Sequence, residues 1–89
     1  MAKIVVTHGV VDVDNWLKGK AERAEAVTGM GCTNVVDYVA QDGSKAIAIS
    51  AETQDVDGVL AAMGSPSPEV AAAMGRHGVV PPLTVYIEK

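Results

Sequence analysis

The sequence predicts an α+β fold in which four strands and two helical segments alternate as strand, helix, strand, strand, helix, strand. A β-branched run from Lys3 to Val11 has the pattern of a strand buried on both faces. Two segments with apolar residues at helical spacing follow Asp12 and Asp55. Two alternating runs in between are joined by Asp42-Gly43, a frequent turn pair between neighbouring strands.

Length and composition favour a small globular protein. The 89 residues suit one domain spanning 1–89, and a hydrophobic fraction of 48 % excludes a disordered chain. Such a chain buries only about 60–65 % of its unfolded surface, so it would gain stability from a partner subunit. With no Phe and a single Trp, the core must be built mainly from aliphatic side chains.

The first strand should lie in the middle of the sheet because both of its faces are apolar. By the two-residue strand period, His8 shares a face with Ile4, Val6 and Val10. A histidine with an ordinary pKa of about 6.5 is a candidate general base or hydrogen-bond donor. The alternative is a structural histidine that holds the start of the first helix through Asp12 or a backbone carbonyl.

The first helix is expected to begin after Asp12, whose carboxylate can cap the free amides. Gly19 costs this helix about 1 kcal/mol relative to alanine, and Thr28-Gly29-Met30-Gly31 ends it. The apolar stripe consists of Trp16, Leu17, Ala21, Ala24 and Val27. The cations Lys18, Lys20 and Arg23 alternate with Glu22 and Glu25, a pattern typical of a solvated helix face.

Two strands are predicted next, from Cys32 to Ala40 and from Lys45 to Ala51. Strict alternation places Asn34, Val36 and Tyr38 on one face of the first of these strands. The opposite face then carries Thr33, Val35, Asp37 and Val39, and we expect Asp37 to be exposed or paired at a dimer edge.

The second helical segment is expected to begin at Asp55 and to break at Gly64-Ser65-Pro66. Ser67-Pro68 restarts it, since serine is a good cap and proline suits the first helical position. It ends at His77-Gly78, and Leu83 to Ile87 forms the last strand.

This order of elements predicts a ferredoxin-like βαββαβ arrangement, with the first and third strands central and both helical segments on one face of an antiparallel sheet. The other face would also be apolar. Because a monomer rarely leaves so large an apolar surface in water, we expect a homodimer through the sheet faces.

The segments from Thr7 to Trp16 and from Ser67 to Pro82 resemble small bacterial dimeric α+β barrel proteins. Those proteins carry His, Val, Asp and Trp after the first strand, and a Ser-Pro-Glu helix start followed by Met, Gly-Val and proline before the last. The superfamily includes antibiotic-biosynthesis-type monooxygenases, polyketide cyclases, haem-degrading enzymes and members without assigned activity. The resemblance implies the fold and the homodimer, and it extends over nearly the whole chain.

The candidate ligand-binding residues are Trp16, Tyr38, Tyr86 and His77, beside His8 as the candidate catalytic base. Trp16 could equally fill the core, and His77 could cap a helix. The two tyrosines would be pocket donors if they face the helices and interface residues if they face a second sheet. Cys32, the single cysteine, is expected to be a buried small hydrophobic residue.

We expect no metal, flavin, haem or nucleotide cofactor, since no ligand cluster and no glycine-rich phosphate loop is present. A net charge of −4 argues against nucleic acid or a membrane surface as partner. Met1-Ala2-Lys3 leads straight into a strand pattern, so we expect a cytoplasmic protein. Two functions remain open: a protein that binds a small apolar or aromatic ligand between sheet and helices, and a cofactor-independent monooxygenase or cyclase with His8 as base.

Overall fold

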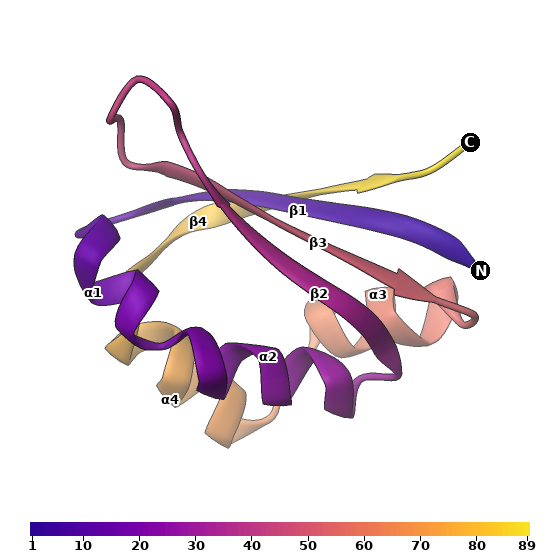
Figure 1. Cartoon of the computed structure of the whole chain (residues 1–89). Coiled ribbons are helices and arrows are strands. Elements are labelled where there is room, and N and C mark those ends of the chain that lie inside the picture. Colours follow the sequence, from indigo (N-terminus) through magenta and orange to yellow (C-terminus); the bar gives the residue numbers. More distant parts are fainter.

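The computed structural model describes all 89 residues, and its four strands form one antiparallel sheet in the order β2-β3-β1-β4 (Figure 1). The strands are β1 (Ala2–Val10), β2 (Cys32–Val39), β3 (Ala46–Thr53) and β4 (Val79–Ile87). The first and third strands are central. The predicted ferredoxin-like α+β fold is therefore confirmed.

All the helices lie on one side of this sheet (Figure 1). They are α1 (Val13–Lys18), α2 (Lys20–Gly29), α3 (Val56–Gly64) and α4 (Pro68–Arg76). The break between α3 and α4 was predicted, but the break at Gly19 was not, because only a loss of helix propensity was expected there. None of the helices has the length and apolar character needed to cross a membrane.

The core lies between the sheet and the helices. The inner row of β1 is buried throughout, with Ile4, Val6, His8 and Val10 each at most 8 % exposed. Cys32 is buried in a cluster with Ile4, Ala51 and Val59, as expected for a small hydrophobic residue. This burial raises the pKa of the Cys32 thiol, which keeps it protonated and unreactive.

A bulge in β2 changes the alternation that the sequence predicted. The pairing of β2 with β3 shifts between Thr33 and Val36, and Asn34 has a φ of 54°. The extra residue lets Cys32 and Val35 both pack on the core, although strict alternation places them on opposite faces.

The last strand begins at Val79, four residues before the predicted start at Leu83, and it includes Pro81 and Pro82. Prolines are tolerated here because β4 is an edge strand. Its pairing with β1 is irregular in the same region, where the register shifts between Thr7 and Gly9.

Candidate functional site: an apolar cavity with one polar end

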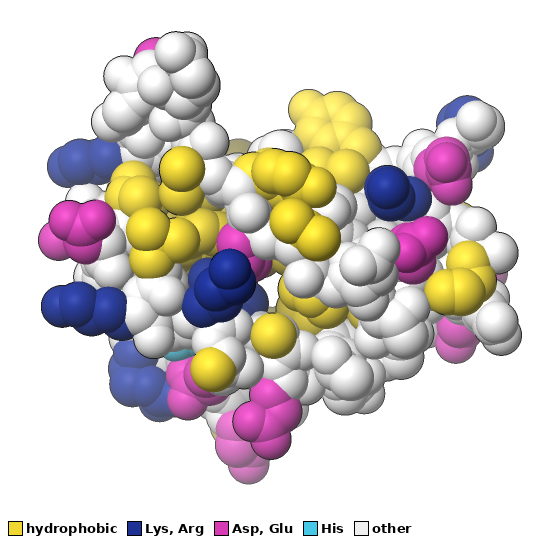
Figure 2. Space-filling model, viewed as in Figure 1, with side chains coloured by type: hydrophobic (Ala, Val, Ile, Leu, Met, Phe, Trp, Pro, Cys, Tyr) yellow, Lys and Arg dark blue, Asp and Glu magenta, His cyan; other side chains and the backbone are white.

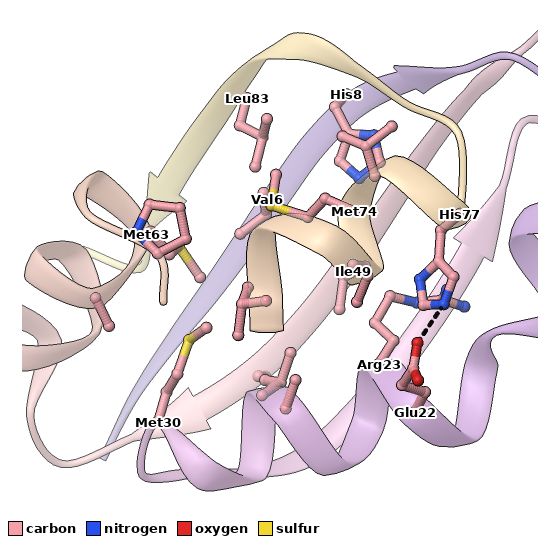
Figure 3. Close-up of a pocket in the computed structure, with 18 of the residues that line it drawn as sticks. Val6, His8, Glu22, Arg23, Met30, Ile49, Met63, Met74, His77 and Leu83 are labelled. Carbon is pink, nitrogen blue, oxygen red and sulfur yellow. Dashed lines mark ion pairs between the residues drawn. The ribbon is translucent and has the colours of Figure 1, made fainter. Parts of the chain in front are cut away.

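A cavity of about 120 Å³ lies between the inner face of the sheet and the helices (Figure 3). An engineered apolar cavity of about 150 Å³ is enough to hold benzene, so this space suits roughly one small ring. Its walls are mainly aliphatic and thioether side chains. They come from the sheet (Ile4, Val6, Ile49, Ala51), from α2 (Ala26, Val27), from Met30, and from α3 and α4 (Ala62, Met63, Val70, Ala73, Met74).

The charged and titratable residues that line the cavity are His8, Glu22, Arg23 and His77. Figure 3 shows them together at one end of the cavity, whereas Met30 and Met63 lie at the other. The space is therefore polar at one end and apolar along the rest, which is the usual arrangement of a site that orients a small molecule.

His8 enters this polar end from the central strand β1, and 8 % of its surface is exposed. Its Nδ1 lies 2.7 Å from the backbone oxygen of Gly9, so Nδ1 carries the proton that it donates and Nε2 keeps a free lone pair. Burial lowers the pKa of His8, and the nearby Arg23 charge lowers it further, although the Gly9 hydrogen bond acts in the opposite direction. The ring is accordingly neutral at pH 7.

Arg23 forms a buried ion pair with Asp37, which was not predicted from the sequence. Arg23 Nη2 lies 3.0 Å from Asp37 Oδ2, and the two side chains are 8 % and 5 % exposed. Arg23 was expected on a solvated helix face and Asp37 at an exposed or dimer edge, and both expectations were wrong. Two features of the sequence could have indicated the pair. Arg23 follows Trp16 by two helical turns, which places it on the same helix face, and Asp37 shares the inner face of its strand with Val35.

Trp16 is fully buried and lines the same cavity, so it belongs both to the core and to the candidate site. The Arg23 guanidinium carbon lies 3.7 Å from the centre of the indole, and Arg23 Nη1 donates to the Trp16 carbonyl at 2.9 Å. The His8 ring meets the indole edge-on, with centroids 6.4 Å apart. The indole Nε1 is buried with no hydrogen-bond partner.

His77 closes the polar end from the C-terminus of α4, where it is the capping residue. Its Nε2 lies 2.9 Å from Glu22 Oε1 on α2. Arg76 holds both oxygens of the same carboxylate at 3.0 Å. This Arg76 hydrogen bond is the main reason that the pKa of Glu22 is lowered. His77 thus joins two helices as well as lining the cavity.

The two tyrosines lie outside this cavity, on the opposite face of the sheet. Tyr38 is 48 % exposed and its hydroxyl lies 3.1 Å from Ser50 Oγ, and Tyr86 is 57 % exposed beside Val5. Of the five predicted site residues, the structure brings together His8, Trp16 and His77. No group of three or more His, Cys, Asp or Glu side chains is arranged to hold a metal ion.

Neither a protein-family model nor a curated protein matches the chain. Solved structures match it over nearly its whole length. An antibiotic biosynthesis monooxygenase is 14 % identical, with a TM-score of 0.69 and coverage of 100 % of this chain and 97 % of the other. Protein Atu4242 from Agrobacterium tumefaciens is 11 % identical, with a TM-score of 0.69 and coverage of 100 % and 92 %.

A variant of SnoaB, a cofactor-independent oxygenase from Streptomyces nogalater, is 15 % identical, with a TM-score of 0.66 and coverage of 96 % of this chain and 89 % of the other. At such low identity, these matches establish a common fold. The chain has the ferredoxin-like fold of the antibiotic biosynthesis monooxygenase-like proteins, which agrees with the resemblance seen in the sequence.

Proposed function

We propose that this protein, with the fold it shares with monooxygenase-like proteins, binds a small apolar or aromatic molecule in the cavity between its sheet and its helices. One observation carries the proposal: the cavity is apolar along most of its wall and gathers its charged and titratable side chains at one end. An empty cavity lowers the stability of a protein, and a cavity that binds no ligand would have this unfavourable effect alone.

Toluene is a suitable probe, since one ring matches the volume of the cavity. Ala73 lines the cavity from α4, and Ala73→Leu should fill it and weaken toluene binding at least about tenfold. Ala72→Leu is the matched control, because Ala72 is the neighbouring residue on the exposed side of the same helix. Calorimetry of the three proteins tests the proposal. It is wrong if the wild-type protein binds no single-ring compound, or if Ala73→Leu binds toluene as well as Ala72→Leu.

A second candidate function is proton abstraction from a bound phenol or activated carbon, as in a cofactor-independent monooxygenase or cyclase. The observation that favours it is the fixed tautomer of His8, whose Nε2 lone pair is left free by the Nδ1 hydrogen bond. A lowered pKa keeps this lone pair available at neutral pH. SnoaB, a cofactor-independent oxygenase with this fold, adds support.

Hydrogen exchange in D2O tests the second function, because it measures the rate at which a base removes a proton from carbon. Phenylacetone carries an activated carbon next to its ring. If His8 is the base, the wild-type protein should speed the exchange of these hydrogens for deuterium in NMR spectra at neutral pH, where the ring of His8 is unprotonated. His8→Gln should bind the same compound without speeding the exchange. Equal exchange rates with the two proteins would contradict a role for His8 as base.

We also propose that the protein is a homodimer through the outer face of its sheet. Apolar and aromatic side chains are present on that face, including Val36, Tyr38 and Tyr86, which are 38 %, 48 % and 57 % exposed. Hydrophobic side chains also reach the surface between β2 and the helices α1 and α2 (Figure 2). The outer sheet face is the better dimer surface, because helices shield the other face of the sheet (Figure 1).

A further inference from the structure

We infer that α4 is a lid over the cavity, and that the ion pairs of Glu22 with Arg76 and His77 are the latch that holds this lid against α2. The inference rests on the proposed binding function and adds the route by which a ligand enters. Figure 3 shows the latch at the polar end of the cavity, where the side chains of Glu22 and His77 meet. A ligand enters between α2 and α4 when the latch opens.

Of the helices that cover the cavity, α4 packs least on the core. Helices α1, α2 and α3 each contribute a buried residue, whereas α4 has none. The inward side chains of α4 are Val70, Ala73 and Met74, which are partly exposed and line the cavity instead of filling it. Segments with few buried apolar contacts open at a lower free energy than the rest of a fold. The part of the cavity wall that opens most easily is therefore α4.

The C-terminal end of α4 is held against α2 by polar contacts. Arg76 Nη2 lies 3.0 Å from both carboxylate oxygens of Glu22, and His77 Nε2 lies 2.9 Å from Glu22 Oε1. Glu22 lines the cavity although 50 % of its side chain is exposed, so this carboxylate lies between the cavity and the solvent. Because exposed ion pairs are weak, the latch can break without unfolding the protein.

Turns on both sides of α4 allow the helix to move as a unit. Gly64, Ser65 and Pro66 are exposed before the helix, and Gly78 follows it with a φ of 71°. Residues at the ends of an element are the usual places where backbone angles change when a lid opens. The chain beyond Gly78 stays in place, because the Val11 amide donates to the Gly78 carbonyl at 2.9 Å.

Arg76→Ala tests the latch without changing the cavity, because Arg76 does not line it, whereas Glu22 and His77 do. Lys20→Ala is the matched control, since it removes the same charge from the start of α2, where Lys20 is exposed and forms no ion pair. Fluorobenzene is the probe: it has one ring and a single ¹⁹F signal, whose line shape in NMR titrations gives the association and dissociation rates. Arg76→Ala should raise both rates about two- to fivefold and leave the dissociation constant nearly unchanged, because the bound ligand keeps its contacts.

Hydrogen exchange of the ligand-free proteins provides a second measurement. The α4 amides should exchange faster in Arg76→Ala than in Lys20→Ala, while the β1 amides exchange equally fast in both. Faster exchange in β1 as well would mean that Arg76 stabilises the whole fold, and Arg76 would then not be part of a latch.

The rates of ligand exchange separate this inference from the binding function. If the two variants exchange fluorobenzene at the same rate, the ligand enters elsewhere, so the inference is wrong and the binding function stands. If the wild-type protein binds no fluorobenzene, the binding function and the lid are both wrong.

Discussion

Gly19→Ala is the substitution whose effect the structure defines most sharply. Gly19 lies between α1 and α2 with a φ of −88°, which alanine adopts without strain. A Cβ at this position, however, would overlap Nε2 of His77 and lie 2.6 Å from its Cε1. The His77 ring is buried and holds Glu22, so it must move to admit the methyl group.

Two effects of opposite sign decide the magnitude. Where alanine can adopt the backbone conformation of the glycine, the replacement raises the free energy of unfolding by about 0.4–1 kcal/mol, because it lowers the conformational entropy of the unfolded chain. Overpacking a filled site costs about 1–3 kcal/mol. We therefore expect Gly19→Ala to lower the free energy of unfolding by about 1–2 kcal/mol, and the melting temperature by about 4–8 °C for each kcal/mol.

Urea unfolding followed by circular dichroism measures this change. Gly75→Ala is the control: Gly75 lies in α4 with open space where the methyl group would stand, and alanine there should stabilise the helix by up to about 1 kcal/mol. In a His77→Ala background the obstacle is gone, and Gly19→Ala should become stabilising. If Gly19→Ala costs the same with and without the histidine ring, the contact with His77 is not the cause.

Three further outcomes are expected. Asp37→Ala should lower the free energy of unfolding in urea by about 3–5 kcal/mol, because it leaves the buried Arg23 charge unpaired. Glu22→Ala, which breaks the exposed pair with Arg76, should lower it far less, and equal losses would contradict the burial of the Arg23–Asp37 pair. Folding lowers the pKa of His8, so the histidine of the unfolded chain is protonated first as the pH falls. His8 therefore contributes fully to stability above about pH 6.5, and the contribution is lost below that pH with a slope of at most about 1.4 kcal/mol per pH unit. A His8→Gln protein whose stability depends on pH as that of the wild type does would refute the lowered pKa of His8. Tyr86→Asp should convert the proposed dimer into a 9.2 kDa monomer in sedimentation experiments, whereas Leu17→Asp, at an exposed leucine on α1, should not. A wild-type protein that is monomeric at micromolar concentration would contradict the dimer proposal.

The parts of the fold that could be predicted depend on local chemistry. Asp12, Asp55 and Ser67 each accept a hydrogen bond from a backbone amide of the first helical turn, as their residue types indicate. The inner row of β1 follows from the two-residue period alone, because this strand is regular through His8. The cap at His77 and the break before Ser67 are local signals of the same kind.

The parts that could not be predicted depend on packing between distant segments. Arg23 and Asp37 are 14 residues apart and meet only because α2 lies under β2. The close approach of His77 to Gly19 joins positions 58 residues apart, and a propensity scale sees only the cost of the glycine. The bulge at Asn34 gave no clear signal, since Asn can occupy either an extended or a left-handed backbone conformation.

The polar end of the cavity contains several features that lower stability, and they are in contact with one another. The Arg23–Asp37 pair is desolvated, burial of His8 lowers its pKa and so destabilises the fold below about pH 6.5, and Trp16 has an unpaired N–H. Aliphatic residues would remove all three costs, since replacing a buried ion pair by hydrophobic residues is frequently neutral or favourable. The other end of the cavity has Met30 and Met63, whose flexible thioethers adapt to different shapes. Unfavourable groups at one end and adaptable walls at the other support the proposal that the cavity binds a small ligand, because real proteins break the rules of stable packing mainly at functional sites.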